Sequence, residues 1–226
     1  MTLTKNTYKL RQEVAAHVAA DSIVQGIYWD TENNRGCFIG CLAKSNDPAI
    51  NEATYGLPVM VQRIAENIFE ALPADEAKVF FAALPDAVAC DGKDLTQIGW
   101  QFLATELRSL PTQPAEIQAV IDPVIAGMDL LASGQEWSAV DASRAAARAA
   151  AAEAADWAAA AAAWAAARAA RATDRAATWA AATAVDAAAA AAWAARAARA
   201  AAVARLRQRD LLLRLIAEAP VVENCQ

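Results

Sequence analysis

The feature that most constrains the fold is an alanine-rich stretch from Ser138 to Ala204. Alanine accounts for 43 of its 67 residues, and neither glycine nor proline occurs between Gly134 and Pro220. Because alanine has the highest intrinsic helix propensity, the stretch is predicted to be helical throughout, apart from bends. A single straight helix from Ser138 to Ala219 would be ~120 Å long. We therefore expect the chain to fold back at least once.

The position of the fold-back is predicted from the spacing of the large residues. One series recurs every seven positions from Trp157 to Arg171, and a second runs from Trp179 to Trp193. The second series is shifted by one residue, and Thr173–Asp174 lies between the two. A break in heptad phase is typical of a bend or a stutter. The stretch is therefore predicted to form a hairpin of helices that bends near Asp174.

The predicted helix from Glu153 to Trp179 has two different faces. At about 100° per residue, most large side chains fall on one arc, and the opposite arc is almost pure alanine. Because an alanine face allows helix axes to approach to the short end of ~8–10 Å, we expect the alanines to face other helices. The tryptophan and arginine arc then faces solvent, a partner protein or a groove. Guanidinium groups bind phosphate and indoles stack on bases, so such a groove would hold an anionic, nucleotide-like ligand. Its candidate residues are Trp164, Arg168, Arg171, Arg175 and Trp179.

Charge and hydropathy exclude some classes of function. Residues 1–137 carry 9 basic and 18 acidic side chains, whereas residues 138–219 carry 11 arginines, 7 acidic side chains and no lysine. The overall pI of about 4.9 argues against general nucleic-acid binding. The longest uninterrupted apolar run, Trp157–Ala167, is shorter than the ~20 residues that a bilayer requires. With no signal-peptide pattern at the start and four cysteines that read as reduced thiols, we expect a soluble, cytoplasmic protein.

The large apolar side chains are concentrated in the first 137 positions and in the last helix, and the sequence predicts an all-α helical bundle. We place a domain boundary at Ser133–Gly134, between an acidic N-terminal helical domain (1–134) and an alanine-rich helical domain packed against it (135–226). Pro123 predicts a kink or a break inside one helix. The predicted helices are Thr7–Val24, Pro58–Leu72, Asp75–Leu84, Asp94–Leu110, Ala115–Ala132 and a leucine-rich final helix, Arg205–Ala219, that docks on the N-terminal part.

A second candidate region runs from Tyr28 to Ser45. Its glycines are four residues apart, as are its cysteines, so on a helix they form one face of small residues. One interpretation is a close-packed helix seam with the cysteines as small buried hydrophobes. The other is an anion site, where a glycine-rich helix start offers free N–H groups beside basic side chains. The candidate ligand-binding residues are Tyr28, Trp29, Asp30, Arg35, Gly36, Cys37, Gly40, Lys44 and Ser45.

Metal and cofactor sites are not expected from the motifs. Cys37 and Cys41 lack a second pair of ligands, and the single histidine, His17, lies in a helical apolar pattern. Glu66 and Glu70 are one helical turn apart, a spacing that can hold a cation or supply an acid and a base but that also fits a solvated helix face. No phosphate loop, dinucleotide motif, catalytic triad or zinc motif is present in the sequence.

Several segments resemble a family of uncharacterised bacterial and phage proteins. In that family a Gly-Cys-x-x-Gly-Cys core, here Gly36–Cys41, and a following proline-initiated helix precede an alanine-rich tail that ends in a leucine-rich helix. The sequence around Tyr28–Asp30 and from Tyr55 to Pro73 fits the same layout. The chain departs from it after the second cysteine, where Lys44 stands near the position of a frequent family histidine. The resemblance implies a role in host–phage conflict, with no assigned activity.

Taken together, these patterns favour a non-enzymatic binding protein without a cofactor. It would sequester a small anionic ligand or block a partner protein. One alternative is an enzyme with a polar pocket around Asp30, Cys37 and Glu66. Another is a structural homo-oligomer assembled through alanine faces.

Overall fold

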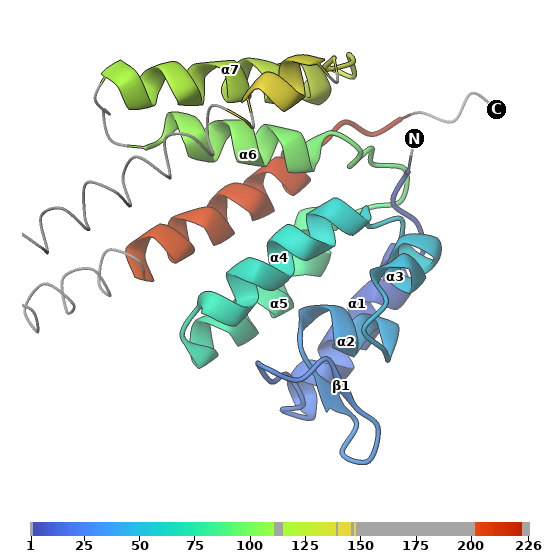
Figure 1. The fold of residues 1–226 in the computed structure, drawn as a ribbon. Helices are drawn as coiled ribbons and strands as arrows, with labels where there is room; N and C mark the ends of the chain where they lie inside the picture. The colour runs from blue at the N-terminus through green and yellow to red at the C-terminus, as the bar shows by residue number, and fades with distance from the viewer. Residues whose placement is uncertain (1, 111–114, 139, 146, 148–201, 223–226) are drawn as a thin grey trace, which may run out of the picture.

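The computed structural model describes residues 2–110, 115–138, 140–145, 147 and 202–222. In these ranges the regular structure is α-helical, with one small two-stranded sheet (Figure 1), so the all-α prediction is confirmed. The predicted helical hairpin and its bend at Thr173–Asp174 lie outside the described residues. Among the helices that are described, none combines the length and apolarity required to cross a membrane.

The helices follow one another closely along the chain, and the sheet lies between the first two. A final helix covers residues 202–218 and is drawn in red in Figure 1. The named elements are α1 (Thr7–Ala19), β1 (Trp29–Asp30), β2 (Arg35–Gly36), α2 (Phe38–Ala43), α3 (Pro48–Tyr55), α4 (Val59–Ala71), α5 (Ala74–Val88), α6 (Ile98–Arg108) and α7 (Ala115–Ala132).

A cluster of phenylalanines forms the centre of the core. Phe38, the first residue of α2, stacks on Phe80 with ring centroids 5.4 Å apart, and it meets Phe69 and Phe81 edge-on at 6.2 and 5.5 Å. All four side chains are almost completely buried. Offset-stacked and edge-on pairs are the geometries that aromatic rings prefer, so α2 is fixed against α4 and α5.

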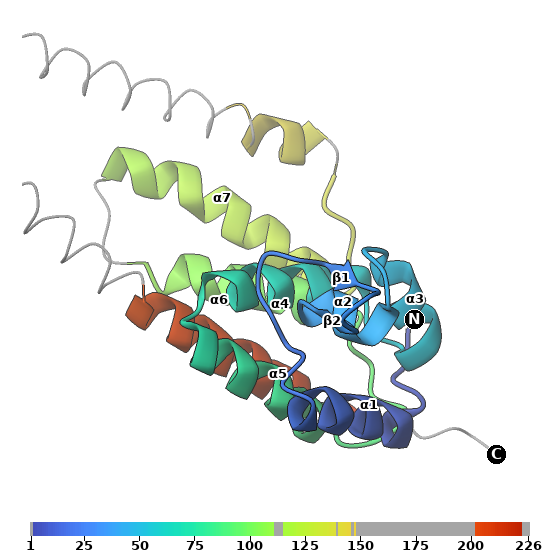
Figure 2. The same ribbon diagram turned by 90° about the horizontal axis from the view of Figure 1, so that it is seen from below.

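The final helix belongs to the same core. Leu211, Leu212, Ile216 and Ala219 are buried in the cluster that contains the apolar side chains of α1 to α6. Figure 2 shows this helix running along α5. The predicted docking of a leucine-rich final helix on the N-terminal part is therefore confirmed. The domain division at residue 134 stays a prediction, because residues 148–201 lie outside the described chain.

The buried side chain of Lys93 connects the C-terminal end of α5 with the C-terminal end of the final helix. Lys93 Nζ donates to the carbonyl oxygens of Ala87 (3.1 Å), Ile216 (3.2 Å) and Ala217 (2.7 Å). It thereby satisfies carbonyl groups at the C-terminal ends of α5 and of the final helix, where a cation is favoured. The backbone of Lys93 also pairs with Val221. The C-terminal segment is thus held against the N-terminal part by both backbone and side chain.

Helix α1 ends at Ala19, five residues before the predicted end. Asp21 adopts a left-handed conformation (φ 47°), which ends the helix. The chain then pairs with β2, because Val24 N donates to Gly36 O (2.9 Å) and Gly36 N donates to Ser22 O (3.0 Å). Tertiary pairing thus overrides the helical pattern of residues 20–24.

Prolines also alter the predicted boundaries. Helix α3 was not predicted; it begins at Pro48, and the Asp47 carboxylate caps it by accepting from Ala49 N at 2.9 Å. Pro85, predicted to end a helix, lies inside α5, and its carbonyl accepts from Ala89 N at 2.9 Å. Pro123 likewise lies inside α7 without a break.

Candidate functional site

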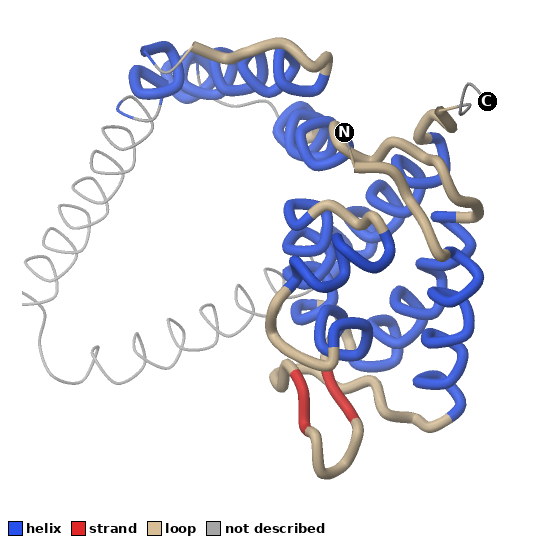
Figure 3. Tube along the Cα trace, turned by 90° about the vertical axis from the view of Figure 1, so that its right-hand side faces the viewer, coloured by secondary structure: helices blue, strands red, loops and turns tan. Residues whose placement is uncertain are grey.

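The hairpin β1–β2 projects from the end of the molecule opposite α7 (Figures 1 and 3). The Asp30 carboxylate organises its loop, because it accepts from Asn33 Nδ2 (2.8 Å), Asn33 N (3.2 Å) and Arg35 Nε (3.0 Å). The hydrogen bonds from Asn33 contribute most to lowering the pKa of Asp30. Asp30 and Arg35 are therefore paired with each other within the hairpin.

The glycines of the predicted small-residue face allow the backbone of Tyr28 to approach α2. A Cβ atom on Gly36 would lie 2.3 Å from Tyr28 O, and one on Gly40 would lie 1.4 Å from it. Cys37 N donates to the carbonyls of Ile27 (2.8 Å) and Tyr28 (3.3 Å) beside this contact. Close packing at these glycines is therefore present, and the partner is the backbone of Tyr28.

The thiols are buried in this seam. Cys37 is 1% exposed, and burial, followed by a hydrogen bond to Glu66, raises the pKa of its thiol to about 12. Burial also raises the pKa of Cys41 to about 11. Glu66 Oε2 accepts from Ile39 N at 3.0 Å, and burial raises the pKa of its carboxyl group. Because the thiolate is the nucleophilic form, both cysteines are poor nucleophiles at neutral pH.

Lys44 lies over Trp29, with Nζ 4.7 Å from the ring centroid, in a cation–π contact. Lys44 Nζ also contacts His17 Nε2, and it lies 3.5 Å from a carboxylate oxygen of Glu13. His17 Nδ1 is 2.6 Å from Ser22 Oγ. Burial, and then the charge of Lys44, lowers the pKa of His17. A neutral His17 is therefore the form that suits these neighbours.

The structure divides the predicted residues of the Tyr28–Ser45 region among several places. Gly36, Cys37 and Gly40 lie at the seam, whereas Ser45 Oγ accepts from the amide of Asp47, next to α3. Tyr28 is 45% exposed, and its hydroxyl accepts from Arg63 Nη1 at 3.3 Å. Four pockets among the described residues are lined by other residues. The arc Trp164, Arg168, Arg171, Arg175 and Trp179 lies outside the described residues, so its role stays a prediction.

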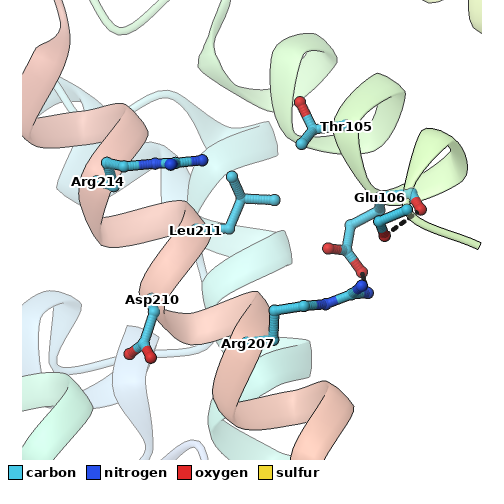
Figure 4. Close-up of a pocket in the computed structure, with 7 residues that line it drawn as sticks. Thr105, Glu106, Arg207, Asp210, Leu211 and Arg214 are labelled. Atoms are coloured by element: carbon cyan, nitrogen blue, oxygen red, sulfur yellow. Dashed lines mark hydrogen bonds and ion pairs between the residues drawn. The ribbon is translucent and has the colours of Figure 1, made fainter.

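A groove of about 280 Å³ lies between α6 and the final helix (Figure 4). Arg207, Leu211 and Arg214 face it from the final helix at the i, i+4 and i+7 positions of one helix stripe. In Figure 4 the Arg214 side chain extends across the groove toward Thr105, and Asp210 points away from α6. The remaining lining residues are Glu106 and Ser109.

Three of the four charged side chains that line the groove are already paired. Glu106 Oε2 accepts from Arg207 Nη2 (3.1 Å) and Gln208 Nε2 (2.7 Å), while its Oε1 is buried without a hydrogen-bond partner in the described chain. Asp210 pairs with Arg209 Nε at 2.8 Å. These pairings neutralise the two carboxylates that line the groove.

Arg214 is different, because no carboxylate of the described residues lies within 4.0 Å of its guanidinium group. The hydroxyls of the opposite wall already donate to backbone carbonyls, Thr105 to Gln101 O and Ser109 to Glu106 O, each at 2.7 Å. The guanidinium group is thus the main donor that the groove offers to a ligand.

This groove was not predicted from the sequence. The final helix was predicted only to dock, although its arginines at positions 207 and 214 share a stripe with Leu211. That seven-residue spacing is the signal that could have identified them. The partner wall, α6, is about 100 residues away in sequence and carries no matching motif.

In the comparisons with known proteins, no family model, no curated protein and no solved structure matches the chain.

Proposed function

We propose that this protein is a non-enzymatic binding protein that holds a small anionic, nucleotide-like ligand in the groove between α6 and the final helix. The observation that carries the proposal is Arg214, which extends across the groove and has no described carboxylate partner (Figure 4). A planar guanidinium group binds phosphate through two parallel hydrogen bonds.

The rest of the groove fits such a ligand in shape and character. Arg207, which is paired with Glu106, lies at the far end of the stripe, and the largely buried Leu211 forms the apolar floor between the two arginines. The buried, unpartnered Oε1 atom of Glu106 is suited to accept from an amino group after a small side-chain movement. The volume of about 280 Å³ is near the lower limit of ~300 Å³ for ligand pockets, so a mononucleotide is the expected size class.

The buried groups of the N-terminal part support a binding role over catalysis. Burial holds Cys37 and Cys41 as neutral thiols, and Asp30 is tied to its own hairpin by Asn33 and Arg35. The enzyme alternative around Asp30, Cys37 and Glu66 therefore has less support. Blocking of a partner protein, a role in host–phage conflict and homo-oligomerisation stay predictions from the sequence.

The test is calorimetry on the full chain with adenine and guanine mono-, di- and triphosphates, and with inorganic phosphate. The wild type, Arg214→Gln and Arg11→Gln are compared, because Arg11 carries the same charge on α1 with Asp86 as its surface partner. Losing a charge-assisted hydrogen-bond pair costs about 1.5–3 kcal/mol, so Arg214→Gln should weaken nucleotide binding about 10-fold to 100-fold. Arg11→Gln should bind like the wild type.

Two results would contradict the proposal. The first is a wild-type protein that binds none of these nucleotides. The second is an equal loss of affinity in Arg214→Gln and Arg11→Gln, which would show a general effect of charge and no specific site.

A further inference from the structure

We propose that Cys37, Glu66 and Glu70 form a binding site for one divalent transition-metal ion of the zinc class. Cys37 Sγ and one carboxylate oxygen from each glutamate all lie within 4.8 Å of one another. The glutamates occupy successive turns of α4, and Cys37 immediately precedes α2. The site is independent of the groove between α6 and the final helix.

Burial gives the first argument that an ion belongs there. Glu66 is 8% exposed and Cys37 is 1% exposed, so a carboxyl group and a thiol that share a hydrogen bond lie together in the protein interior. Among the described residues, no lysine, arginine or histidine nitrogen lies within 4.0 Å of a Glu66 or Glu70 oxygen. Buried carboxylates are normally paired with a cation or coordinate a metal. A divalent ion would take the place of the thiol proton and bring a positive charge to the two carboxylates.

The hydrogen bonds around the glutamates hold them ready for a ligand. Glu66 Oε2 accepts from Ile39 N at 3.0 Å, and Glu70 Oε2 accepts from Gly26 N at 2.8 Å. Each carboxylate therefore has a second oxygen that these backbone groups do not use. Metal-binding carboxylates are commonly oriented by such outer hydrogen bonds. Glu70 is exposed, which gives an ion access from solvent.

The donor set selects the class of metal. A thiolate with two carboxylates suits zinc and its cobalt substitute, whereas magnesium and calcium prefer oxygen donors alone. Three protein ligands leave one position of a tetrahedron for water. On binding, the bond from Cys37 Sγ to its proton is replaced by a bond from sulfur to the metal. The proton passes to solvent, together with any proton that Glu66 carries.

The test uses the full chain and Co²⁺ as the probe, followed by competition with Zn²⁺. The wild type should bind one Co²⁺ with a thiolate-to-cobalt charge-transfer absorption, and Zn²⁺ should displace it. Calorimetry in two buffers should show release of about one proton or more per ion. The variants are Cys37→Ser and Glu70→Gln, with Cys90→Ser and Glu32→Gln as matched controls, since Cys90 and Glu32 are exposed and outside the cluster.

The absorption should disappear in Cys37→Ser. Glu70→Gln keeps an acceptor for Gly26 N, so it should fold; its affinity should fall more than the ~10–100-fold expected from losing an outer hydrogen-bond partner. Both controls should bind like the wild type. The proposal is overturned if the wild type shows no charge-transfer band, if the band survives in Cys37→Ser, or if Glu70→Gln binds as tightly as the wild type. If Cys37→Ser does not fold, the affinity of Glu70→Gln for Co²⁺ alone decides whether the proposal stands.

Discussion

Replacing Gly40 with alanine tests the seam between α2 and the segment before the hairpin. The new Cβ would lie 1.4 Å from Tyr28 O and 2.4 Å from Tyr28 C, whereas ordinary contacts begin at 3.4 Å. Tyr28 would therefore have to move by about 2 Å. Its carbonyl accepts from Cys37 N, so the movement would also disturb the start of α2.

The size of the effect follows from two opposing contributions. Overpacking a core costs about 1–3 kcal/mol, and the upper end applies because the obstacle is backbone. Alanine regains about 1 kcal/mol of helix propensity over glycine. Gly40→Ala should therefore lower the free energy of unfolding by about 2 kcal/mol, measured by urea denaturation followed by circular dichroism.

Gly99→Ala in α6 is the matched control. Its Cβ would also be crowded, at 2.6 Å from Met60 Sδ, but the obstacle is the end of a flexible side chain. Its free energy of unfolding should stay within about 1 kcal/mol of the wild type. If Gly40→Ala is as stable as Gly99→Ala, the backbone of Tyr28 does not restrict the side chain at position 40.

Three further predictions concern buried polar groups. Lys93→Met should lower the free energy of unfolding by about 3 kcal/mol in urea denaturation, because three carbonyl groups at two helix ends lose their donor. Burial lowers the pKa of His17 in the folded state, so the unfolded state binds more protons at this residue when the pH falls. The free energy of unfolding should therefore be highest above about pH 6.5 and should fall, relative to His17→Gln, as the pH drops toward the lowered folded pKa. Cys37 and Cys41 should react with a thiol reagent at neutral pH far more slowly than the exposed Cys90, as followed by mass spectrometry of peptides.

Each of these predictions has a result that counts against it. For Lys93→Met, the comparison is Lys78→Met, which removes one exposed ion pair and should cost less than about 1 kcal/mol; equal losses would exclude the capping role. A pH profile that is the same for the wild type and His17→Gln would show that His17 titrates as it does in the unfolded chain. Labelling of Cys37 at the rate of Cys90 would show that the seam opens readily.

Local patterns predicted much of the helical framework. The range Ala115–Ala132 was predicted with the bounds that α7 has, and the range Pro58–Leu72 matches α4 to within one residue at each end. The final helix was predicted to dock, and it does. These helices have periodic apolar residues and clear signals at their ends, so the local sequence is sufficient to predict them.

Features that depend on distant segments could not be predicted in this way. The early end of α1 is caused by pairing with β2 around Gly36, and the seam partner of Gly40 is the backbone of Tyr28, which has no side-chain signature. The cluster of Cys37 with Glu66 joins positions that are far apart in sequence, and the sequence placed them together only as members of an enzyme pocket with Asp30, without Glu70. The groove beside Arg214 likewise needs two helices to be placed together before it exists.

Nucleotide binding in the groove is tested most directly by a crystal structure of the full chain with the nucleotide that binds most tightly in calorimetry. A phosphate group is expected within hydrogen-bond distance of the Arg214 guanidinium, in the groove between α6 and the final helix. A nucleotide bound elsewhere, with this groove unchanged, would contradict this expectation.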